Sequence, residues 1–168
     1  GLLAPLSGVR QVHSALSDAG IGYVAQTSSL PPDMPGTVLE VLRTGLPWHF
    51  FSRNKAPAGL LENVLSHFDC ARLAAQPFGQ MKRVLIARAV LASRRFIVLD
   101  EPCAGLDTQN TERIMDALYD LNQTQGTTIL QVTHDKVAAL RYSSHVWHVA
   151  DGAVHDESLE EHLGEARG

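Results

Sequence analysis

Two adjacent carboxylates end a short, wholly apolar run of the sequence. The run Phe96–Leu99 leads directly into Asp100 and Glu101. An unbroken apolar run that follows a helix is typical of a buried parallel strand. A carboxylate at the tip of such a strand can hold Mg²⁺, usually through water, and a second one beside it can orient an attacking water. The simpler interpretation is that Asp100 caps a turn and that Glu101 is solvated.

Polar side chains also end or follow two other β-prone runs. Gln26 ends the run 21–26, and His134 and Asp135 follow the run 127–133. In open parallel sheets the ligands bind outside the carboxyl ends of the strands, so we expect these polar groups to share one edge. Considered singly, Gln26 could be a solvated loop residue, and His134 could cap the turn into the next helix.

The elements expected around these strand ends alternate between helix and strand. The pattern Thr37–Glu40 is that of a capping box, and apolar residues at 60, 61, 64, 65 and 68 have the spacing of an amphipathic helix. Further helices are expected at 81–92, 108–125 and 136–141, with Gly126 as the stop of the second. Asp151 and Gly152 predict a hairpin turn between strands 145–150 and 153–155. This alternation predicts an α/β domain with a largely parallel sheet.

Composition excludes several classes of protein. The 168 residues carry a net charge of −4 without a block of one sign, so no nucleic-acid partner is expected. The apolar runs are too short to cross a bilayer, so a membrane role would come through a partner. The two cysteines, Cys70 and Cys103, form no disulfide framework, which favours a reducing cytosol.

Four motifs, in order along nearly the whole chain, resemble those of the ATP-binding cassette of ABC transporters. Tyr23–Gln26 looks like the Q-loop, and 96–101 is similar to the Walker B strand. Ala104–Asp107 matches the D-loop, and Thr133–Asp135 resembles the switch-histidine segment. Each motif is weak alone, but their order and strand contexts identify the sequence as a member of this family.

The resemblance implies a reaction, its ligands and its partners. The family hydrolyses ATP with Mg²⁺, which assigns Asp100 and Gln26 to the metal with its bound ATP, and Glu101 to the attacking water as the catalytic carboxylate. By the same resemblance His134 meets the γ-phosphate, and Asp107 contacts a second cassette, although Asp107 is also expected to cap the helix that follows it. Two cassettes pair head to tail and drive an integral-membrane permease subunit. The implied location is cytoplasmic, peripheral on the inner face of the cell membrane.

The phosphate-binding loop of the family, G-x-x-x-x-G-K-[ST], does not occur in this sequence. Its backbone N–H groups and its lysine hold the phosphates, but none of the three lysines here, Lys55, Lys82 and Lys136, follows a glycine. The segment Gly1–Gly8 resembles the stretch just after the helix that this loop opens. We therefore expect an N-terminally truncated cassette, a partial P-loop NTPase-type sheet with a helical subdomain inserted and with the first strands missing.

The signature segment, Leu-Ser-Gly-Gly-Gln with a following arginine, is also altered. In one alignment Gln80 and Arg83 keep their nucleotide-binding places while Gln76–Phe78 replace the first three positions. In the other, Pro77–Gly79 is the turn that precedes the signature, and the signature itself is deleted before Met81. The deletion is slightly favoured, because Pro-Phe-Gly is natural in that turn.

The resemblance also divides the chain and leaves two hypotheses. Residues 1–168 form one incomplete ATP-binding domain, with a helical subdomain and signature region at about 37–92 and a Walker B to switch-histidine core and hairpin at 93–155.

The segments 22–24 and 37–42 look like those of zinc, manganese or iron-chelate importers. The first hypothesis is therefore an ATPase subunit for metal-ion uptake, inactive as this fragment alone. The alternative is a non-hydrolysing remnant or interaction module that docks on a transporter subunit.

Overall fold

The computed structural model describes residues 7–9, 11–12, 14, 20–26, 37–47, 59–70 and 81–157. Within these residues a three-stranded parallel sheet has the order β1-β2-β3, with strands Gly22–Val24, Phe96–Asp100 and Thr128–Val132. The expected α/β fold is confirmed, and β2, the strand that ends in the two carboxylates, lies in the middle. β1 is shorter than the run 21–26, because its pairing with β2 stops where Val24 meets Leu99.

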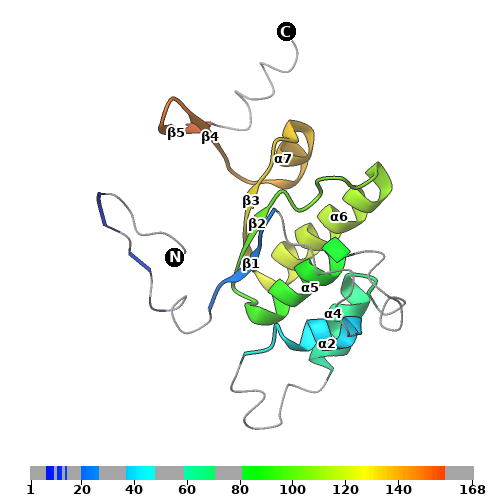
Figure 1. Cartoon of the computed structure of the whole chain (residues 1–168). Coiled ribbons are helices and arrows are strands. Elements are labelled where there is room, and N and C mark those ends of the chain that lie inside the picture. The colour runs from blue at the N-terminus through cyan, green and yellow to red at the C-terminus, as the bar shows by residue number, and fades with distance from the viewer. Residues whose placement is uncertain are drawn as a thin grey trace.

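Helices α5 and α6 lie on the same side of this sheet (Figure 1). α5, Met81–Ala92, packs on β1 and β2, and α6, Thr108–Gln125, packs on β3. The alternate β2 side chains Ile97 and Leu99 are completely buried, while their neighbours along the strand are half-buried. Because side chains alternate between the two faces of a strand, the sheet has one well-covered apolar face in the described part of the chain.

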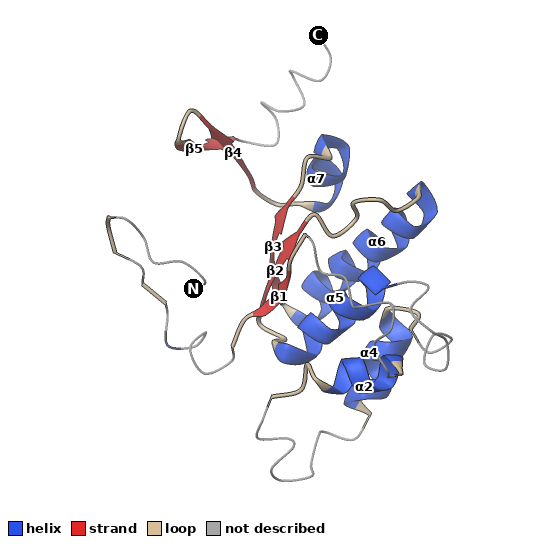
Figure 2. Cartoon of the chain, in the orientation of Figure 1, coloured by secondary structure: helices blue, strands red, loops and turns tan. Residues whose placement is uncertain are grey.

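Two shorter helices pack against α5 and thicken the helical layer (Figure 2). α2 is Val38–Arg43 and α4 is Leu60–His67. The expected capping box of α2 is present, since the Thr37 hydroxyl accepts a bond from the Glu40 backbone N–H at 3.4 Å, and the Glu40 carboxylate accepts one from the Thr37 N–H at 2.6 Å. Two backbone donors at the helix start are thereby satisfied, which fixes where α2 begins.

Local signals also fix the ends of α6 and the start of α7, Lys136–Tyr142. Asp107 caps α6, and Gly126 ends it in the left-handed conformation at φ 66°. Asp135 caps α7 by accepting a bond from the Ala138 N–H at 3.0 Å. The helix boundaries expected from the sequence are therefore confirmed to within one residue.

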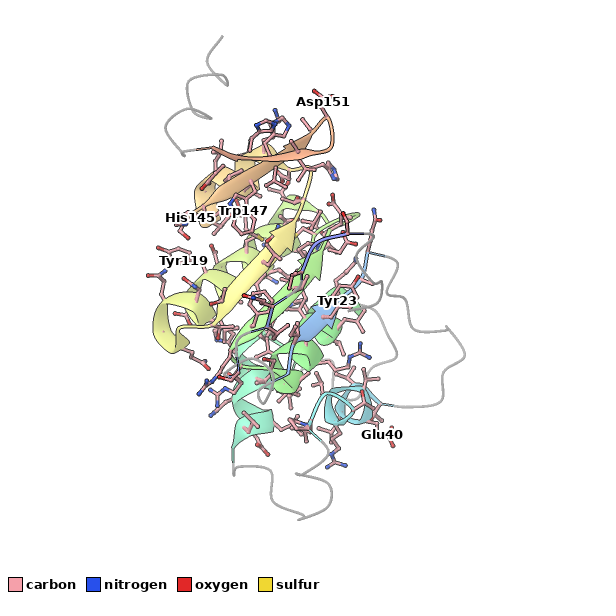
Figure 3. The ribbon with its side chains drawn as sticks, turned by 90° about the vertical axis from the view of Figure 1, so that its left-hand side faces the viewer. Tyr23, Glu40, Tyr119, His145, Trp147 and Asp151 are labelled. Carbon is pink, nitrogen blue, oxygen red and sulfur yellow. The ribbon has the colours of Figure 1, made fainter. Side chains whose placement is uncertain are left out.

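The hairpin β4–β5 forms a separate two-stranded sheet in the described part of the chain. Its strands are Val146–Ala150 and Ala153–Glu157, and they pair antiparallel around Asp151 and Gly152, both at positive φ. Asp151 lies at the tip of the hairpin (Figure 3). The first strand begins after His145 and the second runs beyond the expected end, because Val146 pairs with Glu157.

Several apolar side chains near these strands face solvent. Val132 at the end of β3 is 55% exposed, and Trp147 and Val149 of β4 are exposed as well. β3 is one of the two edge strands of the described sheet. None of the described helices is both long enough and apolar enough to cross a membrane.

The close packing of α5 on β1 depends on a glycine. A Cβ atom placed on Gly22 would collide with the backbone carbonyl oxygen of Ala89 in α5. Since that oxygen belongs to a helix backbone, it cannot turn aside as a side chain would. Gly22 therefore sets the separation of α5 and β1, and with it the position from which α5 side chains reach the strand ends.

We expect Gly22→Ala to destabilise the fold by about 1–3 kcal/mol, because overpacking forces backbone shifts. The free energy of unfolding, measured by urea titration, should fall by this amount. Thr128→Ala, which changes an exposed side chain of β3, is the control and should stay within about 0.5 kcal/mol of the parent. An unchanged urea midpoint for Gly22→Ala would contradict the close approach of β1 and α5.

Candidate functional site

The carboxyl ends of three parallel strands bring the expected polar residues to one edge of the sheet. Gln26 follows β1, Asp100 ends β2 with Glu101 next to it, and His134 follows β3. The register pairs Asp100 with the last residue of β3, so the β2 and β3 ends are level. Segments that are distant in the sequence thus meet where the chemistry of open parallel sheets is found.

Glu101 and His134 are in direct contact. The carboxylate oxygen Oε1 of Glu101 lies 2.8 Å from Nδ1 of His134 and accepts a second bond from the His134 backbone N–H at 3.1 Å. The Glu101 side chain is only 13% exposed, whereas that of His134 is 83% exposed. A largely buried carboxylate is therefore held by an imidazole that itself faces solvent.

The backbone of Glu101 is held in an unusual conformation. Its φ is 48°, in the left-handed region that residues with a side chain rarely adopt. Its N–H donates to the carbonyl oxygen of Val132 at 2.9 Å, and its own carbonyl accepts a bond from the Ala104 N–H at 3.2 Å. These bonds hold the residue just beyond β2 and direct its side chain toward His134.

Glu101 raises the pKa of His134 above the ordinary value of 6.5. The main cause is the hydrogen bond between the two side chains, and the negative charge of Glu101 adds to it. Both favour the protonated imidazole. The Glu101–His134 pair is thus an ion pair over a wider pH range than an isolated histidine would allow.

Asp100 and Gln26 carry side-chain oxygens at the same edge. Asp100 is half-buried and Gln26 is exposed. Mg²⁺ is usually held by one or two protein oxygens together with water and substrate phosphates, so these two residues fit such an ion. No set of three or more His, Cys, Asp or Glu side chains among the described residues is arranged to hold a metal by itself.

Asp107 has the capping role expected of it. Its Oδ1 accepts a bond from the Asn110 backbone N–H at 2.7 Å, and its Oδ2 accepts one from the Asn110 amide at 2.8 Å. These bonds hold the pKa of Asp107 below its usual value. The preceding residues 103–106 line one pocket together with Glu101 and His134. The D-loop candidate therefore borders the strand-end site, and any contact of Asp107 with a second cassette remains a proposal.

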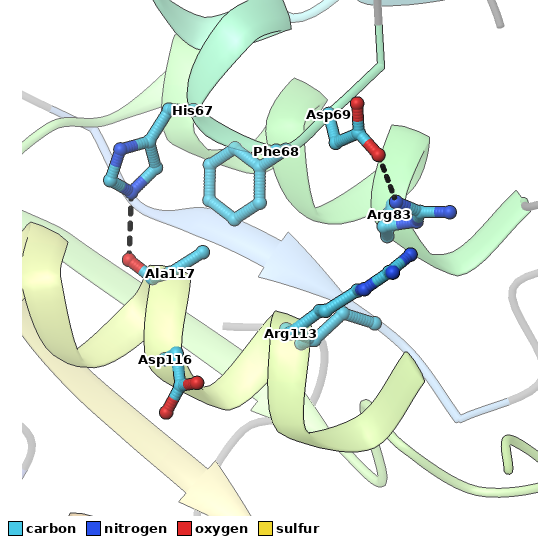
Figure 4. A pocket seen from close by; sticks show the side chains of 8 residues that line it. His67, Phe68, Asp69, Arg83, Arg113, Asp116 and Ala117 are labelled. Carbon is cyan, nitrogen blue, oxygen red and sulfur yellow. Dashed lines mark hydrogen bonds and ion pairs between the residues drawn. The ribbon is translucent and has the colours of Figure 1, made fainter. Parts of the chain in front are cut away.

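Arg83 lies in a different pocket, between α4, α5 and α6 (Figure 4). Its side chain is 6% exposed and pairs with Asp69 at 3.3 Å, close to Arg113 and Phe68. Gln80 and the rest of the altered signature segment lie outside the described residues. The structure thus does not bring Arg83 to the edge that holds Glu101 and His134.

Lys82 belongs to the strand-end site, although the sequence pattern did not single it out. Its Nζ donates to the backbone carbonyl oxygens of Gln26 at 3.3 Å and Glu101 at 3.4 Å. The available signal was a lysine in the first turn of an otherwise buried helix.

Cys103 lines the same site, but burial raises the pKa of its thiol to about 11, which keeps it protonated and unreactive.

Comparison with known proteins identifies relatives of the chain. No model of a protein family matches the chain. The chain is 32% identical over 151 residues to the zinc uptake system ATP-binding protein ZurA of Listeria innocua, covering 84% of this chain and 59% of that protein. It is 34% identical over 113 residues to the phosphonates import ATP-binding protein PhnC of Escherichia coli O157:H7, covering 67% and 43%.

Solved structures show the same fold. An inward-facing ABC transporter of the metal-chelate type superposes with a TM-score of 0.78 at 25% identity, covering 95% of this chain and 65% of that one. The dimeric ATP-binding cassette MJ0796, bound to ADP and phosphate, superposes with a TM-score of 0.65 at 32% identity, covering 83% and 62%. The chain thus spans less than two thirds of the length of each of these proteins.

We expect Glu101→Gln to return the pKa of His134 toward 6.5, because the variant loses the carboxylate charge. An NMR titration of the imidazole ring measures this directly. Glu112→Gln, the same change at an exposed glutamate of α6, is the control and should leave the titration unchanged. A titration of His134 that does not move in Glu101→Gln would contradict the pairing.

The same pair makes stability depend on pH. Since the pKa of His134 is higher in the folded than in the unfolded chain, the stabilisation is fully present below the unfolded value, about 6.5, and is lost as the pH rises through the folded value.

Proposed function

Because the chain belongs to the family of ATP-binding proteins of ABC transporters, we propose that it forms part of the ATPase that drives a membrane transporter. The observation that supports this most is the contact of Glu101 with His134, at the strand edge that also carries Asp100. Phosphoryl transfer to water requires a group that orients the water, a ligand for the metal ion and a group that contacts the phosphate. Glu101, Asp100 and His134 are of the types that these three roles need.

In this proposal Glu101 orients the attacking water. His134 donates to Glu101 through its ring nitrogen and through its backbone N–H, and both bonds end on Oε1. The other carboxylate oxygen, Oε2, is therefore the one that faces the water. With the carboxylate fixed in this way, the water can be aligned with the γ-phosphorus before reaction, which lowers the entropic part of the barrier.

His134 contacts the γ-phosphate through its other ring nitrogen. Nδ1 faces Glu101, which leaves Nε2 on the exposed side of the ring. When Nδ1 carries the proton that it donates to Glu101, Nε2 can donate to a phosphate oxygen only if the ring is protonated. The pKa of His134, raised by Glu101, therefore favours the form that binds phosphate.

Asp100 and Gln26 would hold Mg²⁺ together with the substrate ATP. The ion, when bound, neutralises charge on the β- and γ-phosphates. Asp100 is fixed as the last residue of the central strand, while Gln26 lies in the segment after β1. Their different anchoring suits Asp100 to hold the ion and Gln26 to report whether the γ-phosphate is present.

We propose that the partners are a second cassette and an integral-membrane permease, on the cytoplasmic side of the cell membrane. The dimeric cassette MJ0796 supports the first of these. Metal-ion uptake is preferred over phosphonate import, because the zinc uptake relative matches 84% of this chain and the phosphonates import relative matches 67%.

Hydrolysis by the transporter tests the proposal. In a complex purified with its membrane subunit, Glu101→Gln should lower kcat for ATP by about 10²–10⁴-fold, the usual loss when such a group is removed. Glu112→Gln is the matched control and should keep the parent rate. A stable complex without hydrolysis, or hydrolysis that survives Glu101→Gln, would favour the interaction module instead.

We propose further that these 168 residues alone bind ATP more weakly than about 1 mM, because they contain no glycine-lysine loop to hold the phosphates. Calorimetric titration of the purified chain with Mg-ATP should show no saturation in the micromolar range. Micromolar affinity with steady hydrolysis that is lost in Glu101→Gln would overturn this expectation.

A further inference from the structure

The ammonium group of Lys82 joins the ends of two strands. Its Nζ donates to the carbonyl oxygen of Gln26 after β1 and to that of Glu101 after β2. We propose that Lys82 is a positioning residue, which ties the Gln26 segment to the Glu101 segment and so sets the orientation of the Glu101 carboxylate. This inference rests on the proposed hydrolysis at this edge and adds to it a residue from α5.

The chemistry of lysine suits this position. An ammonium has three donors and no acceptor, so it can bridge two carbonyl oxygens at once, and hydrogen bonds from a charged donor are stronger than neutral ones. Lys82 is half-buried, and its stem leaves the first turn of α5. The same helix is fixed against β1 about two turns further along, where Gly22 closely approaches Ala89, so the ammonium is supplied from a helix that is packed on the sheet.

The contact acts on Glu101 through its backbone. At φ 48° the residue occupies a region that costs free energy, and it persists only where its surroundings hold it. Its carbonyl oxygen is held by two donors, the Ala104 N–H and the Lys82 ammonium. Without the ammonium only the Ala104 N–H of these two donors holds the carbonyl, so the peptide rotates more easily and the Glu101 side chain shifts with it, away from His134.

A purely electrostatic role would have the opposite signature. Lys82 is a positive charge near Glu101, and removing a positive charge from the neighbourhood of an imidazole raises the pKa of that imidazole. Misplacing Glu101 lowers the pKa of His134, because the hydrogen bond and the nearby negative charge are lost. The direction in which the pKa of His134 moves when Lys82 is replaced therefore distinguishes a positioning role from a purely electrostatic one.

The first experiment needs no nucleotide. In the 168-residue chain, an NMR titration should show a lower pKa of His134 in Lys82→Met than in the parent, and the parent value in Lys82→Arg, which keeps a charged donor. Lys136→Met removes an exposed lysine near His134 and is the control. The ring signal of His67, whose Nε2 lies 2.7 Å from the Ala117 carbonyl oxygen, should keep its position if the fold is intact.

A pKa of His134 that rises or stays unchanged in Lys82→Met overturns the proposal. A fall of the same size in the pKa of His134 in the control variant Lys136→Met overturns the proposal as well. If Lys82→Met does not fold, Lys82→Leu takes its place, and the same outcomes decide.

The second experiment uses the transporter complex. Lys82→Met should lower kcat for ATP by about 10- to 100-fold with little change in KM, since misplacement of a reacting group by about 1 Å costs up to 10²-fold. Lys82→Arg should restore most of the rate, and Lys136→Met should keep it. A change confined to KM would overturn the positioning role. If Glu101→Gln hydrolyses ATP normally, the proposed function fails, while the titration of His134 still decides whether Lys82 positions Glu101.

Discussion

Parallel pairing of β2 with both of its neighbours is the constraint on which the site depends. Because β2 is the middle strand, its end must lie beside the ends of β1 and β3, and the register makes Asp100 level with the end of β3. Glu101, one residue after Asp100, and His134, two residues after Val132, are then close enough to meet. If the pairing of β2 and β3 slipped by one position, the side chains after β2 would turn to the opposite face and the contact would be lost.

The strained backbone of Glu101 is explained by this pairing of the strands. A positive φ redirects the chain immediately after the strand, so that the Glu101 side chain leaves the sheet toward β3. Three hydrogen bonds to the Glu101 backbone offset the cost of that conformation: its N–H donates to the Val132 carbonyl, and its own carbonyl accepts from the Ala104 N–H and from the Lys82 ammonium. The carboxylate is thus oriented by the fold itself, which is the preorganisation that the proposed hydrolysis would require.

Features with a local cause were predictable from the sequence. The capping box at Thr37, the Asp107 cap, the Gly126 stop and the turn at Asp151 each depend on residues within a few positions of one another. The convergence of the strand ends followed from the alternation of elements. The reach of Lys82 did not, because it depends on how closely α5 packs on β1. The boundaries of β1 and the hairpin strands likewise depend on where partner residues stop, which no single segment contains.

The charges at the strand edge explain why protonation and metal binding should act together. Asp100, Glu101 and Asp135 contribute negative charge there, against Lys82 and the protonated form of His134. A polyanion such as ATP would be repelled by this edge unless its own charge were reduced first, and binding as the magnesium complex reduces it. The Glu101–His134 pair would reduce the repulsion further, since Glu101 raises the pKa of His134 and so favours the protonated imidazole that the proposed function places against phosphate. In the proposed function, an edge with more acidic than basic groups would therefore accept a triphosphate as its magnesium complex, with Glu101 directed at His134.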